Sequence, residues 1–289
     1  MWLLGIGSLP TRPLASKHCA TLDSSRRLRM DEWPLSVSAQ QLYARLGTAL
    51  APVVIDVRRD DAFAEDPILI VSARHRPPDQ VSQWAKDLRR SHPIVAYCSH
   101  GHDVSQGVAS ALRDAGIQAA YLHGGISAWK ASGLPTRRKT AGVPDHKWIT
   151  RERPKIDRIA CPWLVSRFIN PLAEFLYVPA TEVLTAAQQM DATPYDVKGV
   201  DFGHHGDRCS FDAIIQAYDI HDPALNRLAR IVRGADTSQP ALAPQCEGLL
   251  AISYGLSANF PNDHDMLGHG LVVYDALYAW CRLQTGRQV

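Results

Sequence analysis

A strand that ends on a cysteine and continues into a loop and a helix is the feature that most constrains the fold of this chain. The apolar residues 95–97 precede Cys98, and the loop 99–105 leads to a segment, 106–116, with helical spacing and a closing glycine. Successive backbone N–H groups and the positive end of a helix stabilise an anion at the centre of such a loop. The layout therefore predicts a thiol with a lowered pKa, a nucleophile. Taken alone, it also fits a buried cysteine acting as a small apolar residue, the commoner state of free thiols.

Two other segments frame the cysteine and favour the first interpretation. Upstream, a β-branched strand, residues 53–58, ends in Asp-Val-Arg; downstream, a strand is followed by Gly124-Gly125 and Trp129. In this order and at these separations, the three signals resemble the rhodanese (sulfurtransferase) domain over residues 35–136. The resemblance implies an α/β domain with a parallel sheet flanked by helices.

The resemblance also implies a site. Cys98 would be the catalytic nucleophile that accepts sulfur as a persulfide, without a cofactor. The residues implied to bind a substrate oxyanion are Ser99, His100, Gly101, His102, Asp103, Val104, Ser105 and Arg58. For Arg58, the alternative is a structural ion pair with Asp56.

Two departures from the family pattern bear on the sulfur donor. The loop is one residue longer than in ordinary rhodaneses when the helix-end glycine is the anchor, as in relatives that accept larger tetrahedral oxyanions. Asp103 stands near the place where many thiosulfate-using members carry a basic residue, and a carboxylate repels an anionic donor. The expected donor is therefore a larger oxyanion, a protein-borne persulfide or a thiol-bearing molecule, with a thiol as the acceptor.

Composition limits the other classes of function. The chain has 289 residues, 46% of them hydrophobic, and a net charge of +2, which suits two ordinary domains and offers no basic stripe for nucleic acid. No apolar run approaches the roughly 20 residues that span a bilayer. Six cysteines without a Cys-x-x-Cys pair argue against a disulfide framework and a zinc knuckle, and Cys161 and Cys281 fit core thiols. We expect a cytoplasmic protein that binds neither nucleic acid nor membrane.

Four segments are expected along the chain. They are an N-terminal extension, 1–34; the rhodanese-like domain, 35–136; a linker punctuated by Pro and Gly, 137–146; and a second domain, 147–289. The extension has no clear periodicity, so we expect it to be disordered or an over-extended gene start, with either Met1 or Met30 as the true first residue. The second domain is expected to be α+β and mainly helical.

Polar residues cluster in the second domain. Histidines and carboxylates gather around glycines in residues 201–212, and more follow near 233–237 and 262–269. Imidazole and carboxylate groups suit a divalent metal of the zinc, iron or manganese type. The candidate metal ligands are His204, Asp236, His269 and Asp201. The alternative is that these residues are helix caps, turn residues and surface charges.

The second domain also resembles a known family, the C-terminal domain of the chromate-resistance protein B family. The runs that carry the resemblance are 154–164, 202–204, 209–212, 231–237 and 273–278. It implies a link to chromate resistance, as a sensor or through a metal or redox function. Arg158 and Arg233 are candidates for binding an oxyanion, or for structural ion pairs with Asp157 and Asp275.

Taken together, these observations predict a sulfurtransferase that forms a persulfide on Cys98 and is coupled to a domain associated with chromate resistance. Possible partners are a sulfur donor, a thiol acceptor and chromate. One alternative is a chromate- or metal-responsive sensor or regulator with a non-catalytic rhodanese-like domain. Another is an interaction protein built on an inactive rhodanese scaffold.

Overall fold

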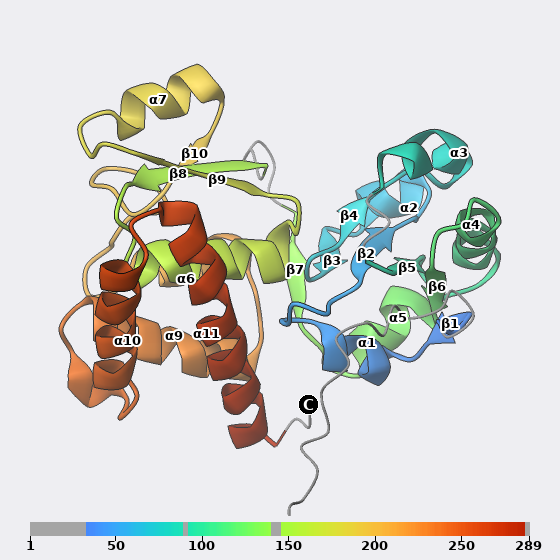
Figure 1. The fold of residues 1–289 in the computed structure, drawn as a ribbon. Coiled ribbons are helices and arrows are strands. Elements are labelled where there is room, and N and C mark those ends of the chain that lie inside the picture. Colours follow the sequence, from blue (N-terminus) through green and yellow to red (C-terminus); the bar gives the residue numbers. More distant parts are fainter. Residues whose placement is uncertain (1–32, 89–91, 140–145, 287–289) are drawn as a thin grey trace, which may run out of the picture.

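The structure is a computed structural model that describes residues 33–88, 92–139 and 146–286 (Figure 1). The N-terminal extension, with both candidate start residues, lies outside the described residues except for its last two positions. Most of the expected linker, 140–145, also lies outside them.

The first domain is built on a five-stranded parallel sheet in the order β1-β6-β5-β2-β4. Its strands are β1 (Ser36–Val37), β2 (Val53–Asp56), β4 (Arg74–His75), β5 (Ile94–Tyr97) and β6 (Ala119–Leu122), and β3 (Ile68–Ile70) pairs with β7 (Thr136–Arg138) in a separate antiparallel ribbon. Strand β5 is buried along its whole length, as expected for a sheet covered on both faces. The predicted α/β fold is confirmed.

Helices cover both faces of this sheet (Figure 1). They are α1 (Ala39–Arg45), α2 (Asp60–Glu65), α3 (Val81–Trp84), α4 (Asp103–Asp114) and α5 (Gly125–Ala131), with 3₁₀ turns at Pro78–Gln80 and Ala85–Asp87. Alternate residues of β5 enter different cores because side chains along a strand point to opposite faces. Val95 and Tyr97 pack with α1 and α5, whereas Ala96 and Cys98 pack with α3 and α4. Cys98 thus lies on the α4 side, directly before that helix.

The second domain is mainly helical around a small parallel sheet in the order β10-β8-β9. Its elements are β8 (Lys147–Arg151), α6 (Asp157–Leu164), β9 (Glu174–Val178), α7 (Val183–Met190), β10 (Thr193–Pro194), α8 (Ser210–Ala217), α9 (Pro223–Asp236), a 3₁₀ turn (Pro240–Leu242), α10 (Cys246–Asn259) and α11 (Asp263–Gln284). Helix α6 contains Pro162 and widens into a π-helical turn, Val165–Ile169, directly afterwards. Proline lacks the N–H of a regular helix, which accounts for the irregular geometry here.

Helix α9 brings Asp236 to its last turn because the helix continues past Arg233. Gly234 lies in this last turn, and a Cβ at that position would lie 2.4 Å from Cys246 Sγ on the neighbouring helix α10. A larger residue would force the two helices apart. Glycine therefore contributes close packing here rather than a helix end.

The two domains share one apolar core, which includes residues of α1 and α5 together with α6, α9 and α11. At their contact, buried Asp222 accepts hydrogen bonds from Tyr278 (2.8 Å) and Tyr43 (3.4 Å) and caps the start of α9. Arg282 donates to the carbonyl of Leu46 (3.2 Å), and its guanidinium lies 4.0 Å from the ring centre of Tyr43. The domains therefore pack as one unit. None of the helices in the described residues is long and apolar enough to cross a membrane.

Candidate functional site

The loop after Cys98 is held in place by the Gly124-Gly125 turn, in which Gly124 is the N-cap and Gly125 the first residue of α5. The N–H of Ile126 donates to the carbonyl of Cys98 and that of Ser127 to the carbonyl of Ser99, both at 3.0 Å. Gly125 has φ of +57°, and a Cβ there would lie 2.3 Å from the oxygen of Cys98. This contact explains why the sequence needs a glycine at a position far from the cysteine along the chain.

The Cys98 thiol lies at the bottom of this loop, 8% exposed, with its Sγ 3.3 Å from Ser105 Oγ. Burial raises the pKa of the thiol, but hydrogen bonds from the Ser105 hydroxyl and from the backbone N–H groups of Ser105, His100 and His102 outweigh it. The net pKa lies below the ordinary value of a cysteine, as the sequence predicts. These hydrogen bonds therefore favour the thiolate of Cys98, which is the nucleophilic form.

The other predicted loop residues differ in accessibility. His100, His102 and Asp103 are exposed, Ser99 and Val104 are half-buried, and Gly101 and Ser105 are buried. Gly101, with φ of +73°, passes so close to the Gly124-Gly125 turn that a Cβ would lie 2.6 Å from the nitrogen of Gly124. The interior of the loop is therefore lined by backbone, while its imidazoles and carboxylate face outward.

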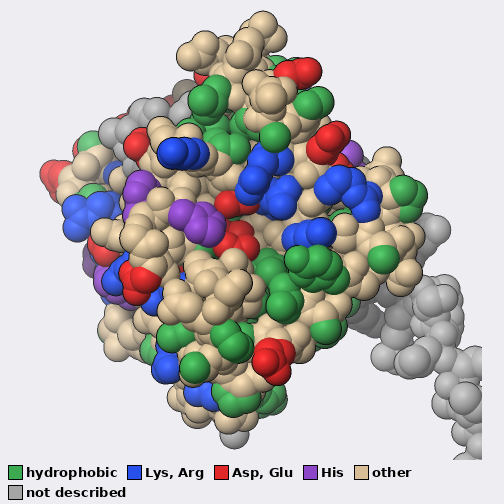
Figure 2. All heavy atoms as spheres, turned by 90° about the vertical axis from the view of Figure 1, so that its left-hand side faces the viewer, with side chains coloured by type: hydrophobic (Ala, Val, Ile, Leu, Met, Phe, Trp, Pro, Cys, Tyr) green, Lys and Arg blue, Asp and Glu red, His purple; other side chains and the backbone are tan. Residues whose placement is uncertain are grey.

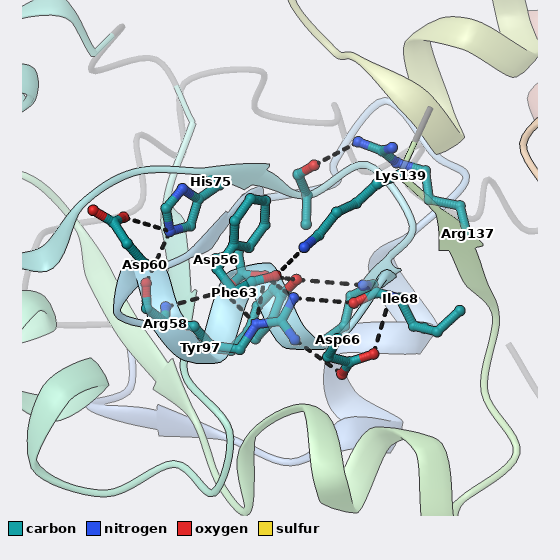
Figure 3. Close-up of polar contacts among 12 residues, drawn as sticks. Asp56, Arg58, Asp60, Phe63, Asp66, Ile68, His75, Tyr97, Arg137 and Lys139 are labelled. Atoms are coloured by element: carbon teal, nitrogen blue, oxygen red, sulfur yellow. Dashed lines mark hydrogen bonds and ion pairs between the residues drawn. The ribbon is translucent and has the colours of Figure 1, made fainter. Parts of the chain in front are cut away.

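The Arg58 guanidinium is buried and bonded to carboxylates and a backbone carbonyl, which favours a structural role over oxyanion binding (Figure 3). It forms a bidentate ion pair with buried Asp56 (Nη2 to Oδ2, 2.6 Å; Nε to Oδ1, 3.0 Å), and Nη1 donates to Asp66 at 2.9 Å. Nη2 also donates to the carbonyl of Ile68 (3.0 Å), and the Tyr97 hydroxyl donates to Asp56 (2.9 Å). The alternative role, a structural partner of Asp56, is the one the structure supports.

A second polar site lies in the second domain, where three carboxylates converge on one imidazole. His204 Nε2 lies 3.1 Å from Asp236 Oδ2, 3.2 Å from Asp196 Oδ1 and 3.6 Å from Asp157 Oδ2. We refer to these four residues as the Asp/His cluster. Asp157 begins α6, Asp196 follows β10, His204 precedes α8 and Asp236 ends α9.

The structure brings together two of the four residues predicted as metal ligands. His204 and Asp236 meet in the cluster. Asp201 is exposed, and its backbone carbonyl is bonded to His205 Nε2 (2.9 Å). His269 is exposed on α11 and stacks on Phe260, with ring centres 4.1 Å apart. Asp201 and His269 are therefore not part of this ligand group, which in the described residues comprises Asp157, His204 and Asp236.

Sequence analysis missed Asp196 as a site residue and gave Asp157 a different role. Asp157 accepts hydrogen bonds from the N–H groups of Ser210 (2.7 Å) and Phe211 (3.1 Å), so it caps α8 from a distant segment. The signal that could have raised interest in Asp196 is its position between a short strand and the 201–212 cluster. Asp157 offered no comparable local signal.

Arg158 and Arg233 both form ion pairs, but their partners are not the predicted Asp157 and Asp275. Arg158 pairs with Asp196 (3.1 Å), to which Arg151 also donates (3.0 Å), and Arg233 pairs with Asp212 (3.0 Å). Asp275 instead pairs with Arg167, at 2.9 Å. The distance along the chain between these partners, rather than any local pattern, made the pairings inaccessible to sequence analysis.

The cluster perturbs the charge of its own members. Burial, reinforced by Asp157 and Asp196, raises the pKa of Asp236 to about 7. The Asp157 and Asp196 carboxylates accept hydrogen bonds from the imidazole and raise the pKa of His204 to about 10. Burial also acts to raise the pKa of Asp196, but His204 and Arg151 outweigh it and the net pKa is lowered. The site thus gathers three carboxylates around one imidazole, with perturbed pKa values at Asp196, Asp236 and His204.

A pocket of about 560 Å³ opens onto this cluster. Its polar lining is Arg151, Asp196, Lys198 and His204, and its apolar lining includes Val183 and Leu184 of α7. Figure 2 shows acidic side chains at the bottom of a hollow that is edged by basic side chains and histidine. The pocket therefore combines an acidic floor with a basic rim.

Comparisons with known proteins follow the two-part structure. The model of the rhodanese-like domain matches residues 38–132, and that of the ChrB C-terminal domain matches residues 148–281. Protein ChrB of Cupriavidus metallidurans is 32% identical over 149 residues, which are 51% of this chain and 44% of that protein. The chain thus spans less than half the length of this curated relative.

Solved structures match the first domain. A rhodanese-related protein from Thermoplasma volcanium is 25% identical, with a TM-score of 0.32, over 36% of this chain and 97% of that one. A protein from Anabaena sp. is 29% identical, with a TM-score of 0.31, over 35% of this chain and 89% of that one. From the family models, the chain joins a rhodanese-like domain, residues 38–132, to a ChrB C-terminal domain, residues 148–281.

Proposed function

We propose that the first domain is a sulfurtransferase in which Cys98 carries the transferred sulfur as a persulfide. The observation that supports this most is the loop of backbone N–H groups around a thiol whose pKa they lower. A rhodanese-like domain that had lost this chemistry would not need to keep cysteine, loop and supporting glycines together. The same N–H groups suit the negative charge of a persulfide, Cys–S–S⁻.

The transfer consists of two displacements at sulfur. The Cys98 thiolate attacks the outer sulfur of the donor, a sulfur–sulfur bond forms, and the donor's own S–S or C–S bond breaks with its electron pair leaving on the donor. An acceptor thiolate then attacks the outer sulfur of the persulfide, and Cys98 leaves as the thiolate it was at the start. No external oxidant or reductant is consumed: a persulfide donor delivers sulfur that is already at the sulfane level, and in a C–S donor the departing carbon keeps the electron pair and is reduced as the sulfur is oxidised.

The charges near the loop favour some donors over others. Residues 99–105 contain two histidines and one aspartate but no lysine or arginine, and Arg58 is occupied by Asp56 and Asp66. A small dianion such as thiosulfate meets the Asp103 carboxylate without a fixed positive side chain in the loop. We therefore propose a persulfide or a thiol-bearing molecule as the donor, ahead of thiosulfate, and a thiol as the acceptor.

A steady-state transfer assay tests this function. Thiosulfate, 3-mercaptopyruvate and glutathione persulfide are offered as donors, with a small thiol as acceptor, to the full chain and to Cys98→Ser. We expect transfer from the persulfide or mercaptopyruvate, and its loss in Cys98→Ser. Cys19→Ser, at a cysteine outside the described residues, is the control and keeps the wild-type rate. Equal rates for wild type and Cys98→Ser would contradict the proposal.

The second candidate is a chromate- or metal-responsive sensor in which Cys98 is not a catalyst. It is favoured by the shared core, because Tyr43 of the first domain and Tyr278 of the second both bond to Asp222. A ligand bound in one domain is thereby linked mechanically to the other. Thermal stabilisation by chromate without sulfur transfer from any donor would support the sensor. In either case, we propose that the process served is chromate resistance, on the strength of the ChrB C-terminal domain.

A further inference from the structure

We propose that the Asp/His cluster binds a first-row divalent cation through His204, Asp157 and Asp236, with Asp196 beside them. This proposal goes beyond sulfur transfer and does not rest on it. The donor atoms of His204, Asp157 and Asp236 all lie within 4.8 Å of one another. They come from the start of α6, the loop before α8 and the end of α9, so only the fold brings them together.

The geometry around His204 Nε2 is the main argument. An imidazole nitrogen carries at most one hydrogen, directed in the plane of the ring, so it can donate to one acceptor only. Three carboxylate oxygens nevertheless lie 3.1, 3.2 and 3.6 Å from it. A cation bonded to each donor at about 2.1 Å would leave neighbouring donor atoms about 3.0–3.4 Å apart, close to these separations. One cation can thus stabilise a convergence that one hydrogen cannot.

The carboxylates are held in position by contacts outside the cluster. Both oxygens of Asp157 accept backbone N–H groups at the start of α8, and Asp196 is bonded by Arg151 and Arg158. Such supporting bonds fix the direction of metal ligands and are typical of built sites. The arrangement is also costly to maintain without a function, since it buries acidic groups at the meeting point of several elements.

The donor types select the class of cation. One imidazole nitrogen with carboxylate oxygens suits Mn²⁺, Fe²⁺ or Zn²⁺ and disfavours cations that require thiolates. The nearby buried thiols donate to carboxylates instead: Cys161 to Asp157 (3.6 Å) and Cys209 to Asp212 (3.5 Å). These thiols are therefore not required as ligands of the cation.

The pocket beside the cluster gives the cation access to small ligands. His204 and Asp196 line it, and Arg151 and Lys198 add positive charge around them. Coordination positions not filled by protein would face this pocket of about 560 Å³. Water or a small oxyanion is the chemical class that fits an exposed cation beside basic side chains.

Metal titration of the full chain tests the proposal, and Mn²⁺ is the probe because it binds thiols weakly. Chelator-treated protein is titrated with Mn²⁺, and free Mn²⁺ is counted by electron paramagnetic resonance. We expect one Mn²⁺ to bind per chain and to be displaced by Zn²⁺. In His204→Ala and in Asp236→Asn, we expect Mn²⁺ to bind about tenfold to hundredfold more weakly.

Two neighbours that lie outside the ligand group supply matched controls: His205→Ala for the histidine and Asp201→Asn for the aspartate. Both are expected to bind Mn²⁺ as the wild type does. Circular dichroism verifies that each variant is folded, and Asp236→Asn, which keeps the shape of the side chain, is decisive if His204→Ala unfolds. Absence of Mn²⁺ and Zn²⁺ binding by the wild type, or wild-type affinity in folded Asp236→Asn, would overturn the proposal.

Discussion

The two candidate sites of this protein are built in opposite ways. The loop 99–105 after Cys98, here called the thiol loop, uses backbone N–H groups of residues that follow the cysteine directly. The Asp/His cluster uses side chains from segments between residues 157 and 236. The first site is formed by one continuous strand-loop-helix segment, which the Gly124-Gly125 turn then holds in place. The second exists only after α6, α8 and α9 have packed. A site whose residues lie close together in the chain can be predicted from the sequence. A site whose residues meet only through packing cannot be predicted in this way.

The surroundings of the two sites also have opposite effects on the thiol pKa values of Cys98 and Cys161. Burial raises the pKa of Cys98 and of Cys161 alike. At Cys98 the surrounding N–H groups reverse that effect, whereas at Cys161 the neighbouring Asp157 adds to it. The pKa of Cys161 is therefore raised and that of Cys98 is lowered, so the surroundings favour the thiolate form at Cys98 and disfavour it at Cys161.

The largest expected effect comes from removing the buried carboxylate that pairs with Arg58. Replacing Asp56 by alanine leaves the buried guanidinium of Arg58 and the Tyr97 hydroxyl without their acceptor. We expect a loss of about 3–5 kcal/mol in the free energy of unfolding, measured by chemical denaturation. Asp60→Ala, whose side chain is 84% exposed, is the control and should change stability little. Similar stabilities of the two variants would show that the buried pair is not a structural anchor.

A smaller effect is expected where the two glycines hold the loop. In Gly125→Ala the new Cβ meets the oxygen of Cys98, so we expect a loss of about 2–4 kcal/mol and a sulfur transfer rate reduced at least tenfold. Gly133→Ala is the matched control: its φ of +60° is similar, but a Cβ there meets nothing within 4 Å. It should cost only about 1 kcal/mol and leave transfer intact. Equal losses in both variants would mean that backbone strain alone, and not the contact with the loop, is responsible.

Ser105 should set part of the reactivity of the thiol. The rate of Cys98 alkylation is expected to reach its plateau at a lower pH than that of a free cysteine, because only the thiolate reacts and its pKa is lowered. Ser105→Ala removes the hydroxyl 3.3 Å from Sγ, so the midpoint should move upward by about one pH unit. Ser110→Ala, on the exposed side of the same helix, should leave the midpoint unchanged. An unchanged midpoint in Ser105→Ala would exclude this hydrogen bond as a cause.

The smallest expected effect concerns the choice of donor. Asp103→Asn removes a negative charge at the exposed start of α4, so the rate with thiosulfate should rise about fivefold, equivalent to roughly 1 kcal/mol. The rate with an uncharged thiol donor should change little, and added salt should reduce the difference. Asp114→Asn, at the far end of the same helix, is the control. An equal gain for charged and uncharged donors would argue against electrostatic repulsion.

The comparison also explains how much the sequence could predict. The parallel sheet and the position of Cys98 before a helix follow from short segments whose geometry is local, whereas the contact of Gly125 with the Cys98 carbonyl joins segments 27 residues apart. The helical nature of the second domain was predictable for the same reason. His204 and Asp236 could be proposed as a pair because both lie in polar, glycine-containing runs.

The remaining features depend on contacts between distant segments. Asp157 caps α8 across 53 residues, and Arg158 pairs with Asp196 rather than with its neighbour Asp157. Arg58 could be assigned to structure rather than substrate only when Asp66 and Ile68 were seen to occupy its other donors. The choice among several carboxylates for one guanidinium depends on packing, which a linear pattern does not record.

The central claim, that Cys98 carries sulfur while the other described cysteines are structural, is tested most directly by intact mass. The wild type and Cys98→Ser are exposed to glutathione persulfide, freed of excess reagent, and their masses and cysteine-containing peptides are compared. The account predicts one added sulfur atom on the wild type, located on Cys98 and removed by an acceptor thiol, and none on the variant. Sulfur on another cysteine, or none on the wild type from any donor, would contradict it.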